Sequence, residues 1–333
     1  MKRKFTVFIF CWCLIVFVSL SHSTDQNHID LSEKIIKIKS AISYRFGKQG
    51  FGFYDWADGK LKIFNWNLEV EKAIPITLGE GPGEIKPFIF NACLVKDNIL
   101  LNGYMGEKIN IYNMEGKFTK SIIIDFSPRL ILYHQKKLYI FNAAFFETRG
   151  SKIFAKIIDP LSGNTIKEVR LKDKIGSDKA FDGNTSLSRR LYRFDVGDNS
   201  NIYLLGIAEN TLFEINENGK LIKETKLPHK FRMKYNVEKE GKNTLVNIAM
   251  YDLYHDFMVI KNTVYACYQK TVKQDEKTGE LVVQTHVVKL NNKGKYSQRI
   301  LDGDFKIIGE HMDILYLFNF EDYHVLPINL NEF

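Results

Sequence analysis

Short apolar runs separated by turn residues make up most of this sequence, and no long stretch has the 3.6-residue spacing of an amphipathic helix. Within the runs, Phe and Tyr stand beside Ile, Val and Leu. This mixture fits the pleated, half-buried surface of a β-sheet better than the face of a helix. The pattern therefore predicts an all-β protein.

One short pattern occurs six times: a polar or turn residue, a short apolar stretch that often includes Tyr, and then usually Asn or Gly. The copies span residues 59–65, 97–103, 136–142, 200–206, 262–268 and 313–319. An apolar run precedes each copy, and most copies are followed by a hairpin with glycine at the reversal, where a positive φ is needed. Four strands repeated six times predict a six-bladed β-propeller of four-stranded antiparallel blades. A β-sandwich and a solenoid are the alternatives.

The two ends of the chain complement each other. The last copy has apolar runs at 305–310, 314–319 and 324–330, and no fourth run follows them. A spare run lies at the other end of the chain, at residues 33–39. If it forms the outer strand of the last blade, an exposed sheet edge disappears. We therefore predict a ring closed by an N-terminal strand.

The first residues have the form of an export signal. Lys2, Arg3 and Lys4 precede an apolar run that ends near residue 20, and small polar residues follow. We expect residues 1–23 to be a signal peptide, or else a retained N-terminal anchor, and residues 24–333 to be one propeller domain. Loss of the three basic residues lowers the formal net charge from +8 to +5. This charge is too small to favour nucleic acid, and a membrane contact is expected only through an uncleaved N-terminal segment.

The cysteines restrict the redox chemistry. Cys11 and Cys13 lie in the N-terminal segment, so the exported chain retains Cys93 and Cys267. Export permits a disulfide, but the repeat places these two residues in opposite blades. We predict two buried free thiols.

A glycine-rich hexapeptide, GEGPGE, spans residues 79–84 between the first two blades. Set between propeller blades behind an export signal, it resembles the bacterial exported six-bladed β-propeller family related to NHL-repeat proteins. The resemblance implies the fold and export and assigns no catalytic residues. Glu80 and Glu84 are candidates to bind a cation or a polar group, and a blade-connecting turn is the structural alternative.

The long insertions of the repeat all belong to one face of the predicted ring. Connections between blades lie on the same face as those between second and third strands, and residues 143–151, 172–190, 228–250 and 269–284 are all of these kinds. Long connections on a rigid scaffold are common binding sites. The candidate ligand-binding residues near the channel mouth on this face are Arg189, Arg190, Tyr192, Arg193, Tyr251, Asp252, Tyr254 and His255.

Other polar residues have less specific patterns. Side-chain amides recur where second strands are expected to end, at Asn65, Asn102, Asn142, Gln269 and Asn319. They either close turns or offer carbonyl oxygens to Ca²⁺. His255 with Asp252 has no recognisable nucleophile motif beside it, and His229 and His286 are isolated in sequence. We therefore assign no metal, cofactor or catalytic residue.

These patterns favour an extracytoplasmic protein that is periplasmic, secreted or on the cell surface. We expect a monomeric, non-catalytic propeller that binds a glycan, a peptide or an envelope protein through its long-loop face. The alternative is a metal-assisted lyase or lactonase-like hydrolase at the channel mouth, because a propeller can gather metal ligands from several blades.

Overall fold

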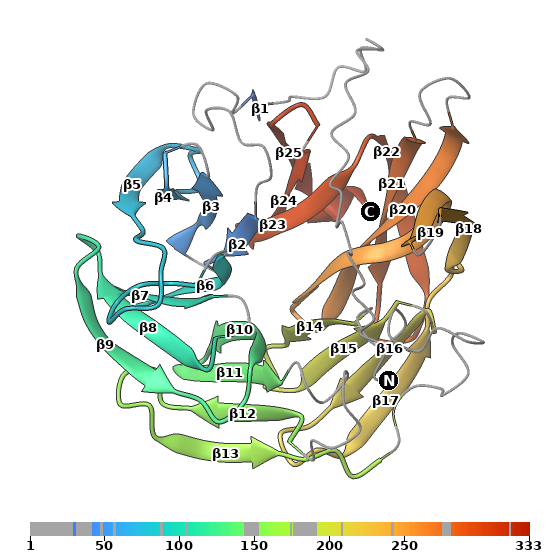
Figure 1. The fold of residues 1–333 in the computed structure, drawn as a ribbon. Helices are drawn as coiled ribbons and strands as arrows, with labels where there is room; N and C mark the ends of the chain where they lie inside the picture. The colour runs from blue at the N-terminus through green and yellow to red at the C-terminus, as the bar shows by residue number, and fades with distance from the viewer. Residues whose placement is uncertain are drawn as a thin grey trace, which may run out of the picture.

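The computed structural model describes residues 29–30, 42–46, 49–55, 58–86, 89–103, 106–142, 153–173, 175, 192–207, 209–240, 243–274, 281–319 and 321–333. In these residues the chain forms six antiparallel sheets arranged in a ring (Figure 1), which confirms the six-bladed β-propeller. Each sheet extends from the centre of the ring outwards, with consecutive strands hydrogen-bonded to each other. Residues 1–28 lie outside the described residues.

The strands follow the chain from blade to blade. The first three blades comprise β2 (Ile42–Arg45), β3 (Phe51–Asp55), β4 (Lys60–Phe64) and β5 (Val70–Pro75); β6 (Ile89–Val95), β7 (Asn98–Gly103), β8 (Lys108–Asn113) and β9 (Phe118–Ile123); and β10 (Pro128–His134), β11 (Lys137–Asn142), β12 (Ala155–Ile158) and β13 (Thr165–Val169). The last three comprise β14 (Tyr192–Val196), β15 (Ile202–Gly206), β16 (Thr211–Ile215) and β17 (Leu221–Lys226); β18 (Arg232–Glu240), β19 (Asn243–Ile260), β20 (Thr263–Gln274), β21 (Leu281–Leu290) and β22 (Tyr296–Asp302); and β23 (Phe305–His311), β24 (Ile314–Asn319), β25 (His324–Asn329) and β1 (Ile29–Asp30). Blade 5 has five strands, unlike the predicted four: β18 is an added strand, and we count the four blade strands from the inner strand β19 to β22. A short 3₁₀ helix, Leu330–Glu332, ends the chain.

The hydrophobic core is divided among the seams between blades. Each of six buried clusters draws its residues from two neighbouring blades, so that together they follow the whole ring. This distribution follows from the alternation of side chains along a strand, because successive residues of each strand point to the blades on either side. The ring is therefore held together by apolar burial at every seam.

Both ends of the chain contribute to blade 6. The N-terminal strand β1 pairs with β25, with Ile29 opposite Val325 and Asp30 opposite His324. The ring is thus closed by an N-terminal strand, as predicted. The segment expected to form it, residues 33–39, lies outside the described residues, and the observed pairing uses residues 29–30 instead.

The sequence repeat was placed one strand out of register in blade 1. Residues 59–65 were aligned with second strands, but β4 is the third strand of its sheet. The Asn65 side chain accepts hydrogen bonds from the backbone nitrogens of Asn67 and Glu69, both at 3.0 Å. The same turn follows the third strands of blades 2, 4 and 5, at Asn113, Asn216 and Asn291. Second and third strands have similar apolar runs, so the sequence pattern alone does not distinguish them.

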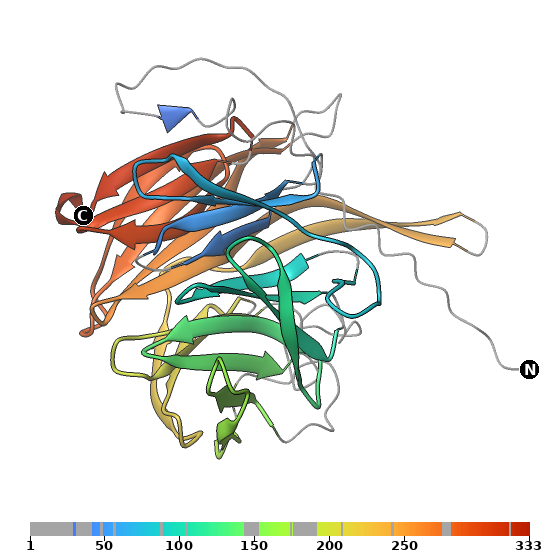
Figure 2. The ribbon, with the colours of Figure 1, turned by 90° about the vertical axis from the view of Figure 1, so that its left-hand side faces the viewer.

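The two faces of the ring carry different connections. Two of the predicted long connections, residues 143–151 and most of residues 172–190, lie outside the described residues. On one face, first and second strands are joined by tight turns with positive φ, such as Lys261-Asn262 and Met312-Asp313. On the other, which we call the linker face, residues 228–250 were expected to form a loop. Most of them belong to β18 and β19, which pair from Arg232 with Asp252 to Glu240 with Asn243. Figure 2 shows this hairpin extending away from the ring.

Cys93 on β6 and Cys267 on β20 are free and buried, in opposite blades, which confirms the prediction. Burial raises the pKa of both thiols, so both are poor nucleophiles.

Among the described residues, no helix has the length and apolar character needed to cross a bilayer.

Candidate functional site

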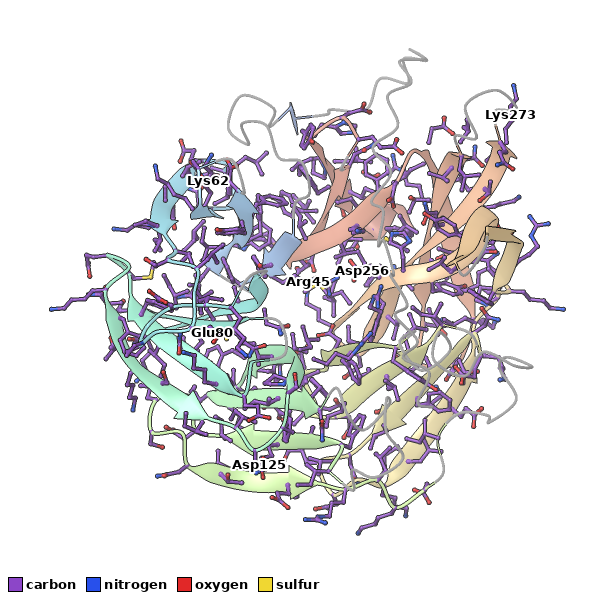
Figure 3. All side chains as sticks on the ribbon, viewed as in Figure 1. Arg45, Lys62, Glu80, Asp125, Asp256 and Lys273 are labelled. Atoms are coloured by element: carbon purple, nitrogen blue, oxygen red, sulfur yellow. The ribbon has the colours of Figure 1, made fainter. Side chains whose placement is uncertain are left out.

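Charged side chains lie at the centre of the ring, on the inner strands of blades 1, 4, 5 and 6. Arg45 on β2 forms an ion pair with Asp256 on β19, and Figure 3 shows these two side chains near the middle of the ring. Arg45 Nη1 also donates to the Phe257 carbonyl at 2.7 Å, and its Nε donates to the Ile307 carbonyl at 2.9 Å. Arg45 thus joins the inner strands of three blades.

Asp195 and Asp256 occupy the same place in successive blades. Asp195 Oδ2 accepts from the Val259 nitrogen of the next blade at 2.7 Å. Asp256 Oδ2 accepts from the Ile307 nitrogen of the blade after that, at 2.9 Å. Each also accepts from the nitrogen of the following residue through Oδ1. The two carboxylates therefore tie one inner strand to the next, and burial raises the pKa of Asp195 to about 6.

Arg193 and His255, two predicted site residues, lie in this central group. Arg193 Nε donates to the His255 carbonyl at 2.9 Å, and His255 Nε2 donates to the Phe305 carbonyl at 2.7 Å. Burial lowers the pKa of His255, so its ring is neutral near pH 7. His255 Nδ1 has no hydrogen-bond partner among the described residues. Both side chains mainly connect blades.

The structure does not pair Asp252 with His255. Asp252 is buried where β18 meets β19, and its Oδ2 accepts from Arg232 Nε at 2.7 Å. Its Oδ1 accepts from the Thr271 nitrogen at 2.8 Å. Asp252 therefore holds together the strands that diverge at the base of the β18–β19 hairpin.

The predicted tyrosines are used for packing and internal hydrogen bonds. Tyr192 donates to Glu209 at 2.9 Å. Tyr254 is fully buried in the seam between blades 4 and 5. The Tyr251 hydroxyl accepts from Gln269 Nε2 at 3.4 Å. Arg189 and Arg190 lie outside the described residues, so their part in the site stays a prediction.

The GEGPGE loop lies against blade 2. The Glu84 carboxylate turns back and accepts from the Gly81 nitrogen at 2.7 Å. A β-carbon at Gly79 would lie 2.1 Å from that carboxylate, so any side chain there would displace the Glu84 carboxylate. Tyr112 donates to the Gly83 carbonyl at 2.8 Å, and the exposed Glu80 lies 3.6 Å from Lys86. These contacts are those of a connecting turn, and any ligand role of Glu80 or Glu84 stays a prediction.

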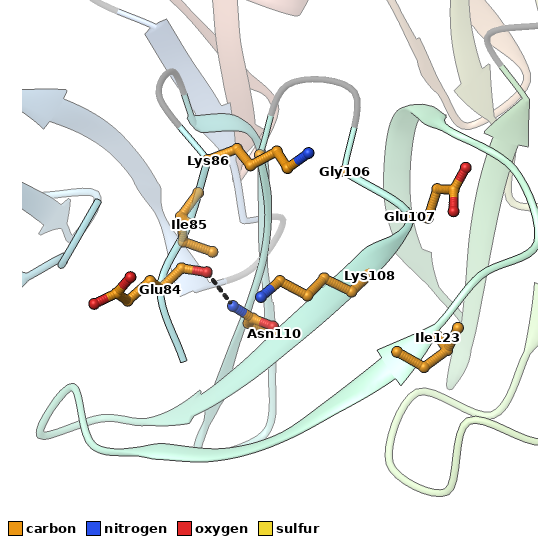
Figure 4. A pocket seen from close by; sticks show the side chains of 9 residues that line it. Glu84, Ile85, Lys86, Gly106, Glu107, Lys108, Asn110 and Ile123 are labelled. Atoms are coloured by element: carbon orange, nitrogen blue, oxygen red, sulfur yellow. Dashed lines mark hydrogen bonds between the residues drawn. The ribbon is translucent and has the colours of Figure 1, made fainter. Parts of the chain in front are cut away.

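A pocket of about 240 Å³ lies beside this loop (Figure 4). Its wall carries charges of both signs, from Glu84, Lys86, Glu107 and Lys108, with the exposed Ile123 at one side. Asn110, which also lines the pocket, donates to the Glu84 carbonyl at 2.9 Å. The pocket is small for a ligand-binding cleft, which commonly has about 300–1,000 Å³.

The expected row of amides does not form one set. Asn65 closes the turn after a third strand, as described above. In second strand β7, Asn102 Nδ2 donates to the carbonyls of Gly106 and Lys108, each at 3.1 Å. After second strand β24, Asn319 Oδ1 accepts from the Glu321 nitrogen at 2.7 Å. These amides organise connections, and within the described ranges no three His, Cys, Asp or Glu side chains gather as metal ligands.

One pair of residues was missed because it is formed only by folding. His229 follows blade 4 and His286 lies on β21, yet their ring centroids are 5.1 Å apart. Both rings also contact Tyr268. Sequence spacing offered no signal for this contact, since 57 residues separate the two histidines.

Blade 5 extends beyond the other blades at the linker face. The β18–β19 hairpin is one extension, and the far ends of β20 and β21 form a second, where Gln274 pairs with Leu281. Figure 3 shows Lys273 at the tip of the second extension. Two apolar side chains, Val272 and Val282, are exposed beside it. We call these two hairpins, residues 232–252 and 270–285, the blade 5 extensions.

The fold is similar to that of solved structures from Bacteroides. A DUF4221 family member from Bacteroides vulgatus ATCC 8482 has a TM-score of 0.53 at 10% identity, covering 87% of this chain and 96% of that one. A putative exported protein from Bacteroides fragilis NCTC 9343 has a TM-score of 0.51 at 13% identity, covering 89% and 84%. BamB from Moraxella catarrhalis is more distant, with a TM-score of 0.43 at 14% identity, covering 85% and 83%. At these identities the likeness shows the fold alone.

No protein-family model matches the chain, and no curated protein sequence does. The propeller that the GEGPGE resemblance implied is confirmed by the fold. The relation to NHL-repeat proteins stays a prediction, because it rests on that hexapeptide and the blade pattern.

Proposed function

We propose that this chain is an extracytoplasmic, non-catalytic propeller that binds a protein partner through the blade 5 extensions. The observation that carries the proposal is the β18–β19 hairpin, which projects from the linker face while the rest of the ring is compact (Figure 2). Export is supported by the basic and apolar N-terminal segment and by the likeness to a putative exported protein.

The backbone of β18 supports a protein partner over a small molecule. Strand β18 is nine residues long, contains no proline and pairs with β19 on one side. In the described part of the chain, no strand pairs with its other side. An open edge of this length can add a strand from a partner through main-chain hydrogen bonds. The exposed Val272 and Val282 on the neighbouring extension offer apolar contact area.

The central charges support a structural role for the channel. Arg45, Arg193 and Asp256 each bond to the backbone of a neighbouring blade. Asp252, the residue considered for pairing with His255, instead holds Arg232 and Thr271. A metal-assisted lyase or hydrolase at the channel mouth would have to use these groups while they hold the blades together. We therefore rank it below the binding function.

The test shortens the hairpin without disturbing the ring. Replacing residues 236–247 by Asn-Gly joins Tyr235 to Ile248, which already pair across the strands, through a tight turn. We expect the thermal midpoint to change by only a few degrees, because the seam clusters stay intact. The wild-type chain is used to capture proteins from the envelope of the producing organism, and these are identified by mass spectrometry. A captured protein that binds the purified wild-type chain should no longer bind this variant.

A matched variant, Val272→Ser with Val282→Ser, alters the second extension only. It should weaken binding less than the hairpin replacement does. Equal binding of the purified partner to the wild type and the shortened chain would overturn the proposal, as would a partner bound at the opposite face.

A further inference from the structure

A row of aromatic side chains crosses blade 5 on the side that faces blade 4. Tyr254 on β19 pairs with Tyr268 on β20, which pairs with His286 on β21. His229, from the connection between blades 4 and 5, stacks on Tyr268 with ring centroids 4.4 Å apart and planes 18° apart. Its ring meets that of His286 edge to face at 5.1 Å. Two imidazoles from separate elements therefore share one site.

The histidine nitrogens of this site have few hydrogen-bond partners among the described residues. His286 is 5% exposed, and neither of its ring nitrogens has a hydrogen-bond partner in the described residues. His229 Nε2 lies 2.8 Å from Gln298 Oε1, on the outer strand β22. The Gln298 side chain also acts on His286, where it favours the protonated ring. A buried histidine without any partner is costly unless another group binds it.

We propose that His229, His286 and the side-chain oxygen of Gln298 bind one divalent transition-metal ion, of the class that includes Zn²⁺ and Cu²⁺. Imidazole nitrogens suit these ions, and the Gln298 oxygen and water would complete the coordination. The ion would occupy the seam between the connection at 227–231 and blade 5. This inference is independent of the proposed partner binding.

The separation of the two rings matches that of two imidazoles bound to one ion. A metal-bound imidazole nitrogen lies about 2.0–2.1 Å from Zn²⁺, so two rings on one ion have centroids roughly 5 Å apart. The observed separation is 5.1 Å. His229 Nε2 already faces Gln298 Oε1, and an ion would replace the proton between them with a small increase in that distance. His229 is half-buried and Gln298 is exposed, so solvent reaches the site from the outer strand.

The protonation states of His229 and His286 also suit the binding of a metal ion. Burial lowers the pKa of both His229 and His286, and each is lowered further by the positive charge of Lys270. Both rings are therefore neutral near pH 7 and can offer a lone pair to a metal ion. Lys270 opposes a bound cation and the nearby Asp252 favours it, so the imidazoles must supply most of the affinity.

The experiment measures metal binding directly. The purified chain, stripped with chelator and dialysed, is titrated with Zn²⁺ by calorimetry, and Cu²⁺ is added for electron paramagnetic resonance. We expect one ion per chain, hyperfine coupling to two imidazole nitrogens, and a rise in the thermal midpoint with Zn²⁺. His229→Gln and His286→Gln should each weaken binding by more than about 100-fold, because the loss of an outer-shell partner alone typically costs about 10- to 100-fold. Gln298→Ala, at an exposed position, should weaken it less and leave folding unchanged.

The matched control is His311→Gln, since His311 of blade 6 stacks on Trp66 of blade 1, at a different seam from this site. It should bind metal like the wild type. The inference is overturned if the wild type binds no Zn²⁺, if Cu²⁺ is coupled to one imidazole only, or if both His229→Gln and Gln298→Ala bind with wild-type affinity. These last two variants keep the test valid if His286→Gln fails to fold.

Discussion

The seam between blades 6 and 1 and the charged group at the centre of the ring hold the same inner strand by different means. On one side of β23, the closing seam packs Phe51, Phe53, Phe64, Leu68, Ile308, Tyr316, Phe318 and Val325, with Phe53 and Phe318 ring centroids 4.6 Å apart. At the centre of the ring, Asp256 accepts from the Ile307 nitrogen and Arg45 donates to the Ile307 carbonyl. Ile308 of β23 is therefore held by apolar packing, whereas the backbone of its neighbour Ile307 is held by charged side chains.

Aromatic packing and charged contacts contribute differently to the ring. Aromatic packing supplies a large buried area where the two ends of the chain must meet, and it needs room: a β-carbon at Gly309 would lie 2.3 Å from the Trp66 ring. The charged contacts bury less apolar surface, but they require one register, because each carboxylate oxygen must meet a particular nitrogen. The seam thus provides stability, and the charges align the inner strands.

The largest effect is expected in the closing seam. Phe318→Ala removes a fully buried ring and leaves a cavity, so the free energy of unfolding should fall by about 3–5 kcal/mol. Urea denaturation followed by fluorescence measures it. Ile123→Ala, at a side chain that is 75% exposed, should change stability by less than about 0.5 kcal/mol. A loss at Phe318 as small as that at Ile123 would contradict the role of the seam.

A somewhat smaller loss is expected in the charged group. Asp256→Asn removes the ion-pair partner of the mostly buried Arg45, at a cost of about 3 kcal/mol. The matched control is Asp313→Asn, whose partner Lys261 is exposed and lies 2.5 Å away. That variant should show no measurable change in urea denaturation. Equal effects of the two substitutions would show that the central ion pair contributes no more than a surface pair.

The smallest effect should depend on pH. Asp195→Ala leaves the Val259 nitrogen without its acceptor and should cost about 1–2 kcal/mol at pH 5. Burial raises the pKa of Asp195 from 3.8 to about 6, so the folded chain binds this proton more tightly than the unfolded one. This tighter proton binding adds to the free energy of unfolding of the wild type at low pH, and the added stability is lost as the pH rises from about 4 through 6. The difference between wild type and variant should narrow from pH 5 to pH 7, and a widening difference would refute the assignment.

The local pattern of the sequence was sufficient to predict the blades. Short apolar runs and glycine reversals repeat because each four-stranded unit has the same local requirements, and these are encoded by neighbouring residues. The repeat count, the closure by an N-terminal strand and the buried thiols Cys93 and Cys267 followed from it. The register of blade 1 did not, because its second and third strands, β3 and β4, are both almost fully buried.

Only the tertiary structure decided which side chains meet. Arg45 lies 211 residues from Asp256 in sequence, and His229 lies 57 from His286, so no local spacing could indicate either contact. Equally, the pair of Asp252 and His255 looked plausible because the residues are close in sequence, yet each faces a different partner. Strand patterns depend on neighbours along the chain, whereas these sites depend on how the ring brings distant inner strands and linkers together.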